Sequence, residues 1–305
     1  MVAKVILLAG LTCLLAQKAD EIPFLVKELK DPDAKVRLKA ALGLGQLGAK
    51  ARDAVPPLID ALKDENEDVR GQAAFALGLI GAEAKTAVPG LVAAMKDKNE
   101  QVRRLAVDAL SRLGPAAKDA LPTLIAALKD DDLGPRAADA IGRMGAVAKE
   151  AIPSLAAALK NGSVRPYAAH ALGQMGSLAV PPLTEALKDQ DTDVRTDVVI
   201  ALGMVGADGV PAIASALKDK EVGVRLNAAG VLARLGPRAS AAVKELAEAL
   251  KDPDEDIRQR VARALGFIGA DAKAAIPALG EALNDKDDGV RKAAADALDR
   301  IRGKK

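Results

Sequence analysis

Aromatic residues are nearly absent from this chain of 305 residues, which has three Phe, one Tyr and no Trp. Half of its residues are nevertheless hydrophobic. The interior must therefore be built from Ala, Leu, Val and Ile, a composition that favours thin helices packed closely together.

Cysteine and histidine are as scarce, with one residue of each. The single cysteine, Cys13, excludes intramolecular disulfides and thiolate-cluster metal sites. A histidine-activated serine or cysteine nucleophile would have to use His170, and no serine stands in a pattern typical of one. The acidic loops have no calcium-loop spacing with a distal bidentate Glu. We therefore predict that the protein is not an enzyme and holds neither a metal nor a cofactor.

An excess of charge of either sign is also missing. The 44 Lys and Arg residues nearly balance the 42 Asp and Glu residues, which leaves a formal net charge of +2. Such a balance provides no global field to attract nucleic acid. We therefore expect no nucleic-acid partner, and any charge selectivity must be local.

The start of the chain holds one apolar run, residues 5–16, which follows Lys4 and precedes a polar segment. This pattern is typical of an export signal, and the run is too short to span a bilayer comfortably. We expect cleavage of residues 1–16, a mature chain without a membrane span, and a periplasmic or extracellular location. The alternative is a retained helix that covers an apolar end of the fold in a cytoplasmic protein.

Repetition is what the chain has in abundance. Nine times an apolar run ending in a form of Ala-Leu-Lys-Asp is followed by Val-Arg and then by Ala-Leu-Gly-x-Ile-Gly, as in residues 56–81. A repeat of this size predicts a solenoid, whose units bury their apolar faces by stacking on their neighbours. We therefore predict one elongated domain over residues 17–305.

Three columns of the repeat predict a helical hairpin. Proline marks the first turn of the first helix, where its missing N–H costs nothing. Glycine ends the second helix and predicts a left-handed C-terminal cap. Asp or Asn ahead of Val-Arg predicts the N-cap of the second helix. These predicted N-caps are Asp33, Asn66, Asn99, Asp130, Asn161, Asp191, Asp254 and Asp287.

The pattern Asp/Asn-x-x-Val-Arg-x-x-Ala-Ala-x-Ala-Leu-Gly-x-Ile-Gly resembles the short HEAT repeat of the phycobilin-lyase type, over about residues 20–302. The resemblance implies an all-α, right-handed α-solenoid, an armadillo/HEAT-type superhelix of nine helical hairpins, with the second helices on its concave side. The arginine after Val recurs in nearly every copy. We therefore expect this ladder arginine to join adjacent repeats rather than to bind a ligand.

Function is expected where the copies differ, because stacking already explains the shared columns. On the second helix the varying positions lie one, five and nine residues after the ladder arginine, on one helical face. The resemblance implies that this face is concave. The candidate binding residues on or beside it are Phe75, Leu79, Arg104, Asp108, Arg112, Asp139, Arg143, Tyr167 and His170.

Two interpretations of the charged candidates stay open. Arginines with carboxylates between them can hold a planar anion or a peptide carboxylate by two hydrogen bonds. Alternatively, Asp108 pairs within its own helix with Arg104 or Arg112, four residues away on either side. Phe75, Leu79 and Leu42 predict an exposed apolar patch for a partner helix, or the site on which a retained N-terminal segment folds back.

These features predict a non-enzymatic scaffold that binds a protein or peptide through its concave face. The resemblance to phycobilin lyases implies an alternative, a lyase-like or chaperone subunit that binds a small anionic ligand such as a bilin. Tyr167, His170 and the nearby arginines are the residues that would contact such a ligand.

Overall fold

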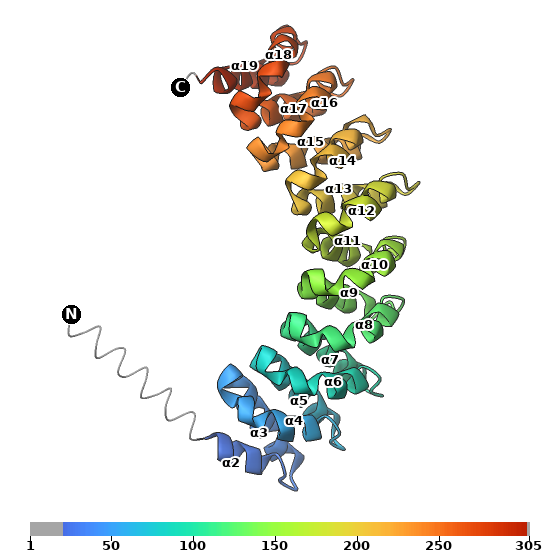
Figure 1. Cartoon of the computed structure of the whole chain (residues 1–305), viewed down its shortest axis with the longest axis vertical. Helices are drawn as coiled ribbons and strands as arrows, with labels where there is room; N and C mark the ends of the chain where they lie inside the picture. The colour runs from blue at the N-terminus through green and yellow to red at the C-terminus, as the bar shows by residue number, and fades with distance from the viewer. Residues whose placement is uncertain (1–20, 304–305) are drawn as a thin grey trace, which may run out of the picture. The chain divides into compact units, whose positions relative to one another are not determined.

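The computed structural model describes residues 21–303, and within that range the chain forms helices joined by turns, without strands (Figure 1). The helices are arranged as nine hairpins, each with a short first helix and a longer second helix. The predicted all-α fold of nine helical hairpins is confirmed. The predicted signal, residues 1–16, lies outside the described residues.

Two compact units are distinguished, one up to Ala151 and one from Ile152. Unit 1 holds four hairpins, with first helices α2 (Ile22–Glu28), α4 (Val55–Ala61), α6 (Val88–Ala94) and α8 (Leu121–Ala127). Their second helices are α3 (Ala34–Gln46), α5 (Glu67–Ile80), α7 (Glu100–Leu113) and α9 (Gly134–Met144). The prediction of a single domain over residues 17–305 stays a prediction.

Unit 2 holds the other five hairpins. Its first helices are α10 (Ile152–Ala158), α12 (Val180–Ala186), α14 (Val210–Ser215), α16 (Val243–Ala249) and α18 (Ile276–Ala282). Its second helices are α11 (Arg165–Gln174), α13 (Thr192–Val205), α15 (Val222–Leu235), α17 (Glu255–Ile268) and α19 (Asp288–Arg302).

Short 3-10 helices join successive hairpins, and one further 3-10 helix, η7 (Ala216–Lys218), follows the first helix of the seventh hairpin. The joining helices are η1 (Gly48–Ala54), η2 (Gly81–Ala87), η3 (Gly114–Ala120), η4 (Gly145–Ala151), η5 (Gly176–Ala179), η6 (Ala207–Gly209), η8 (Gly236–Ala242) and η9 (Gly269–Ala275). Within each unit the second helices of successive hairpins pack side by side, while the first helices and 3-10 segments form the other layer.

The predicted N-caps hold in six copies. In α5, for example, the Asn66 side chain accepts hydrogen bonds from the N–H groups of Asp68 and Val69. The predictions for Asp130 and Asn161 are wrong, because their side-chain oxygens accept hydrogen bonds from N–H groups of the turn before the helix and not of the helix itself. Both of those second helices begin later, with a proline in the first turn that removes one N–H needing a partner.

The glycines predicted to end the second helices have positive φ, as expected. Six of them combine it with a ψ between −127° and −143°, which is not the left-handed helical conformation: Gly81, Gly114, Gly145, Gly206, Gly236 and Gly269. Gly81 is typical, with φ 74° and ψ −143°. That combination is open essentially to glycine alone. At the end of α19, by contrast, Gly303 adopts the left-handed helical cap, with φ 71° and ψ 21°.

The core is formed by small and branched aliphatic side chains, as the composition predicts. Val69, Ala73 and Leu77 of α5 are completely buried. A Cβ atom built on Gly78 would lie 2.9 Å from the Cα of Ala109, so α5 and α7 touch backbone to backbone there. The absence of aromatic rings from the core therefore allows neighbouring second helices to approach closely.

One described stretch, Glu67–Ala94, is long and apolar enough to cross a membrane by length and composition alone. It comprises α5, η2 and α6, and the chain turns at Gly81 between the two α-helices. Leu77 and Leu91 within it are fully buried. Its apolar side chains are thus part of the packing between repeats.

The ladder arginines join adjacent repeats, as predicted. Arg70 donates from Nε to Oδ2 of Asp97 over 2.8 Å and from Nη2 to Oδ1 over 2.9 Å. Its Nη1 donates to the carbonyl oxygens of Asp64 and Glu65 in its own loop. The same two-pronged bond to the next repeat recurs in the pairs Arg37–Asp64, Arg195–Asp219, Arg225–Asp252 and Arg258–Asp285.

The ladder is interrupted between the third and fourth copies. Arg103 donates only to the carbonyl oxygens of Asp97 and Lys98 in its own loop and forms no ion pair with a described residue. In the fourth copy, Gly134 occupies the ladder position. The ion pairs that cross this junction therefore involve two of the residues predicted to bind a ligand, Arg104 and Asp108.

Candidate binding face

We call the surface formed by positions one, five and nine after the ladder column the variable face. Its side chains are half-buried or exposed where they bear a charge, as Arg104, Arg112 and Arg143 do, whereas ladder arginines such as Arg70 and Arg195 are buried. The face thus offers side chains that packing between repeats does not fully enclose. Its predicted concave curvature stays a prediction.

Arg104 of α7 is engaged by two carboxylates. It donates from Nε to Oδ1 of Asp132 over 2.6 Å, and it forms an ion pair with Glu100 one turn earlier. The hydrogen bond to Asp132 raises the pKa of Arg104 above its ordinary value. Because Asp132 belongs to the loop before α9, Arg104 ties the third copy to the fourth.

Asp108 pairs with neither of the arginines on its own helix. Both of its carboxylate oxygens lie 2.9 Å from Nη1 of Arg136 on α9. The predicted pairing within α7 is therefore wrong, because a guanidinium from the neighbouring helix lies closer to this carboxylate. Arg136 was not among the predicted residues, since it stands one position outside the variable columns.

Asp139 lies at the next turn of the same helix pair. Its Oδ2 accepts hydrogen bonds from Oγ of Ser111 over 2.8 Å and from Nε of Arg143 over 2.9 Å. The bond to Ser111 links α7 to α9, and the bond to Arg143 stays within α9. Four of the five charged candidates are therefore held in ion pairs in this structure.

Arg112 is the exception among these five. It is exposed, it forms no ion pair with a described residue, and its guanidinium carbon lies 5.6 Å from the centroid of the Phe75 ring. The structure thus joins a predicted apolar residue to a predicted charged one in a cation–π contact. Arg112 keeps N–H donors at the edge of its guanidinium group available to a ligand.

Phe75 and Leu79 are half-buried rather than exposed. Arg112 covers the ring of Phe75, and Leu79 packs toward α3, where a Cβ on Gly45 would lie 3.4 Å from its Cδ1. The two residues therefore do not form a wide apolar patch. Leu42 on α3 is the exposed aliphatic residue beside them.

Tyr167 and His170 lie on α11, at the N-terminal end of unit 2. The Tyr167 side chain is 49% exposed. His170 is exposed as well, and its Nε2 lies 2.9 Å from Nε2 of Gln174 one turn later. The other seven candidates belong to unit 1, so their predicted convergence with these two stays a prediction.

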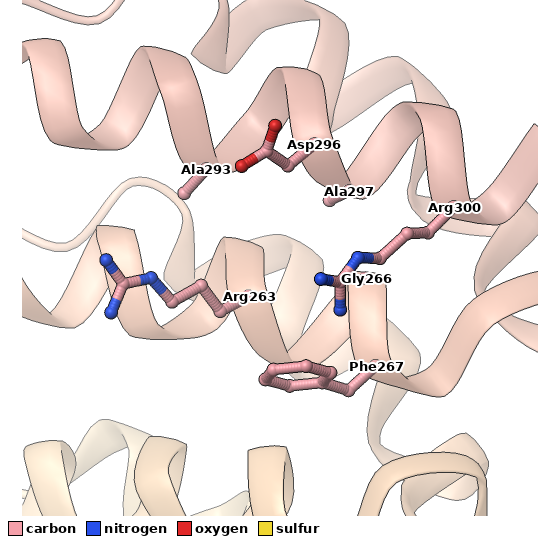
Figure 2. Close-up of a pocket in the computed structure, with 7 residues that line it drawn as sticks. All are labelled: Arg263, Gly266, Phe267, Ala293, Asp296, Ala297 and Arg300. Atoms are coloured by element: carbon pink, nitrogen blue, oxygen red, sulfur yellow. The ribbon is translucent and has the colours of Figure 1, made fainter. Parts of the chain in front are cut away.

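A pocket between α17 and α19 was not predicted as a binding site. Figure 2 shows the residues that line it, with the Arg300 guanidinium directed from α19 toward Phe267 on α17. The cavity has a volume of about 300 Å³. The lining residues are Arg263, Gly266, Phe267, Ala293, Asp296, Ala297 and Arg300.

None of the three charged groups of this pocket, Arg263, Asp296 and Arg300, forms an ion pair with a described residue. The guanidinium carbon of Arg300 lies 4.9 Å from the centroid of the Phe267 ring. A sequence signal for the contact does exist. Phe267 and Arg300 both stand nine residues after the ladder arginine, in consecutive copies.

A sequence profile of the family described as HEAT repeats matches the chain in overlapping windows: residues 22–88, 55–141, 88–166, 135–203, 152–220, 180–249 and 210–299. The chain belongs to the HEAT-repeat family. A comparison with the sequences of curated proteins gives no significant match.

Solved structures similar to this HEAT-repeat protein include Kap95p with RanGDP, at a TM-score of 0.61 and 14% identity over 92% of this chain and 45% of that chain. The karyopherin Kap121p bound to the SUMO protease Ulp1p gives a TM-score of 0.51 and 17% identity over 95% and 40%. The complex of CpcE and CpcF of phycocyanin lyase from Nostoc sp. gives 0.44 and 25% over 81% and 93%.

The two similarities with TM-scores above 0.5 show the fold of this HEAT-repeat protein, an α-solenoid. The chain spans less than half the length of either of those two proteins. Within residues 21–303, no group of three His, Cys, Asp or Glu side chains is placed to hold a metal ion.

Proposed function

We propose that this HEAT-repeat protein is a non-enzymatic scaffold that binds a protein or peptide segment through its variable face. One observation carries the proposal: the buried ladder arginines and three arginines of the variable face form two different classes. Ladder arginines such as Arg70 are buried in bonds between repeats, whereas Arg112, Arg263 and Arg300 on the variable face have no carboxylate partner among the described residues. Stacking of the repeats does not account for the second class.

The setting of these unpaired arginines supports a protein ligand. Arg112 and Arg300 each lie over a phenylalanine ring from the preceding repeat. Aromatic and arginine side chains are the residue types that contribute most to protein interfaces. A solenoid also presents such side chains along an extended surface, which suits an extended ligand.

Selection of displayed random peptides on the immobilised full chain tests this function. Hydrogen–deuterium exchange with the selected peptides then locates the contact. We expect protection on second helices such as α5, α7, α17 and α19. Recovery of no binding peptide, or protection confined to the first helices, would overturn the proposal.

A matched pair of variants sharpens the test. Arg112→Gln removes a guanidinium from the variable face, and Arg52→Gln removes another exposed one from η1, outside that face. Peptides protected at α7 should bind the first variant more weakly and the second as they bind the wild type. Equal loss in both variants would point to non-specific charge attraction instead.

The proposal includes export of the protein and removal of residues 1–16, on the sequence pattern alone. The N-terminal residue of the protein purified from its native cells tests this part. We expect a mature chain that starts near Gln17. Recovery of an intact Met1 would contradict export by a cleaved signal and leave the binding function untouched.

A further inference from the structure

We propose that the pocket between α17 and α19 receives a carboxylate side chain from an acidic segment of the bound peptide. The inference rests on the proposed function, because it assigns a chemical class of ligand to one part of the variable face. Three properties of the pocket lead to it: the way Arg300 is held, the unpaired charges, and the size and walls of the cavity.

Arg300 is held by its stem and by one face of its guanidinium group. Its Cδ lies 3.5 Å from the place where a Cβ on Gly266 would stand, so the stem runs across this glycine. The guanidinium group lies over the Phe267 ring, 4.9 Å from its centroid. Stacking leaves the N–H donors free in the plane of the group, where they match the two oxygens of a carboxylate.

The charges of the pocket favour an anionic group. The pocket is lined by two guanidinium groups, of Arg263 and Arg300, and by one carboxylate, of Asp296. None of the three forms an ion pair with a described residue. The excess of positive charge attracts a carboxylate, and hydrogen bonds between two ionised groups are about twice as strong as neutral ones.

Asp296 favours a peptide over a simple inorganic anion. A phosphate or sulfate ion offers mainly hydrogen-bond acceptors and would be repelled by this carboxylate. A peptide also brings backbone N–H donors, which the Asp296 oxygens can accept. An acidic residue together with its own backbone therefore satisfies both signs of charge in the pocket.

The cavity has room for a side chain with an aliphatic stem. Its volume is about 300 Å³, and its apolar walls are Phe267, Ala293 and Ala297. Phe267 is 46% exposed, so part of its ring is available to the methylene groups of a ligand. Glutamate provides both the methylene groups and the terminal carboxylate.

The experiment uses random peptides displayed on phage and selected in parallel on the immobilised full chain and on three variants. Arg300→Gln removes the stacked guanidinium, and Arg300→Lys keeps a positive charge without the planar pair of donors. Arg238→Gln is the matched control, because Arg238 is an exposed arginine of the same unit that lies on η8, outside the variable face.

We expect peptides from the wild type and from Arg238→Gln to be enriched in Glu, and those from both Arg300 variants to lose that enrichment. For a selected peptide, replacing its Glu by Gln should weaken binding to the wild type about tenfold, measured by fluorescence anisotropy. The same replacement should change binding to Arg300→Gln little, because the partner is already missing.

Outcomes for the pocket and for the general function are separable. Binding peptides without enrichment in Glu, or with the same enrichment on Arg300→Gln, would overturn the carboxylate pocket and leave the scaffold function standing. Recovery of no binding peptide on any form would overturn both. Circular dichroism melting of each variant confirms that a loss of binding does not come from unfolding.

Discussion

Arg70 and Asp97 lie in consecutive repeats and are joined by two hydrogen bonds of 2.8 Å and 2.9 Å, while the third nitrogen of Arg70 holds its own loop. Only 7% of the Arg70 side chain and 13% of the Asp97 side chain are exposed. One arginine therefore fixes both the shape of a loop and its position on the next loop.

Replacing Arg70 by methionine should lower the free energy of unfolding by about 2 to 4 kcal/mol, because it leaves a largely buried carboxylate without its partner. Arg103 stands in the same column one repeat later but bonds only to its own loop. Arg103→Met should therefore cost clearly less. Urea denaturation measures both values, and equal losses would contradict the role of the bond between repeats.

Acid should weaken the same bond. The hydrogen bond from Arg70, helped by the backbone N–H of Asn99, holds the pKa of Asp97 below its ordinary value. In the unfolded chain this carboxyl titrates near pH 4, so its contribution to stability is complete above about pH 5 and is lost as the pH falls toward the folded-state pKa.

Urea denaturation of the wild type and Arg70→Met over this pH range tests the linkage. The difference between their free energies of unfolding should shrink as the pH falls from about 6 to about 3. A difference that stays constant or grows on acidification would show that the bond to Asp97 is not what Arg70 contributes.

Gly78 is required by the contact between α5 and α7. An added Cβ would lie 2.9 Å from the Cα of Ala109, which is backbone and cannot rotate away. Gly78→Ala should therefore lower the free energy of unfolding by about 1 to 3 kcal/mol despite the higher helix propensity of alanine. Thermal and urea denaturation measure the loss.

Gly230 of α15 provides the matched control for this prediction. Its added Cβ would approach only the end of the Arg260 side chain, at 3.4 Å. Since that side chain can move, Gly230→Ala should raise the free energy of unfolding by about 0.5 to 1 kcal/mol through helix propensity. A loss in Gly230→Ala as large as that in Gly78→Ala would contradict the close-contact argument.

Leu77 and Leu79 lie on the same helix, α5, but Leu77 is in the core and Leu79 is on the variable face. Leu77 is completely buried, so Leu77→Ala should lower the free energy of unfolding by about 2 to 5 kcal/mol through lost burial and the cavity left behind. Leu79 is half-buried on the variable face, and Leu79→Ala should cost less than about 2 kcal/mol. Equal losses from urea denaturation would indicate that Leu79 belongs to the core.

Much of the fold could be predicted from the sequence, because each shared column has one physical cause. Proline, an Asn or Asp cap and glycine mark helix ends in most copies, and the ladder arginine recurs because the same bond joins most neighbouring repeats. The caps Asp130 and Asn161 failed where the copies are shorter. There the second helix starts a few residues later along the chain, and an alignment of the repeats by their shared columns does not show where it starts.

The charged candidates were harder to predict, because pairing on a solenoid depends on the offset between neighbouring helices. Spacing along α7 offers Asp108 two arginines, yet Arg136 on α9 lies closer. The pocket beside Phe267 was missed for the same reason. Its second arginine, Arg300, comes from the next repeat, and its proximity follows from how α17 and α19 pack.

The interruption of the ladder between the third and fourth copies bears on how unit 1 melts. In repeat proteins, folding cooperativity depends on the interface energy between nearest neighbours. The ion pairs that cross this junction, Arg104–Asp132 and Asp108–Arg136, are partly open to solvent and therefore screened by salt. Rising ionic strength should thus weaken the interface between α7 and α9 more than interfaces that contain a buried arginine. At high salt the repeats of unit 1 before and after this junction should therefore unfold in separate steps.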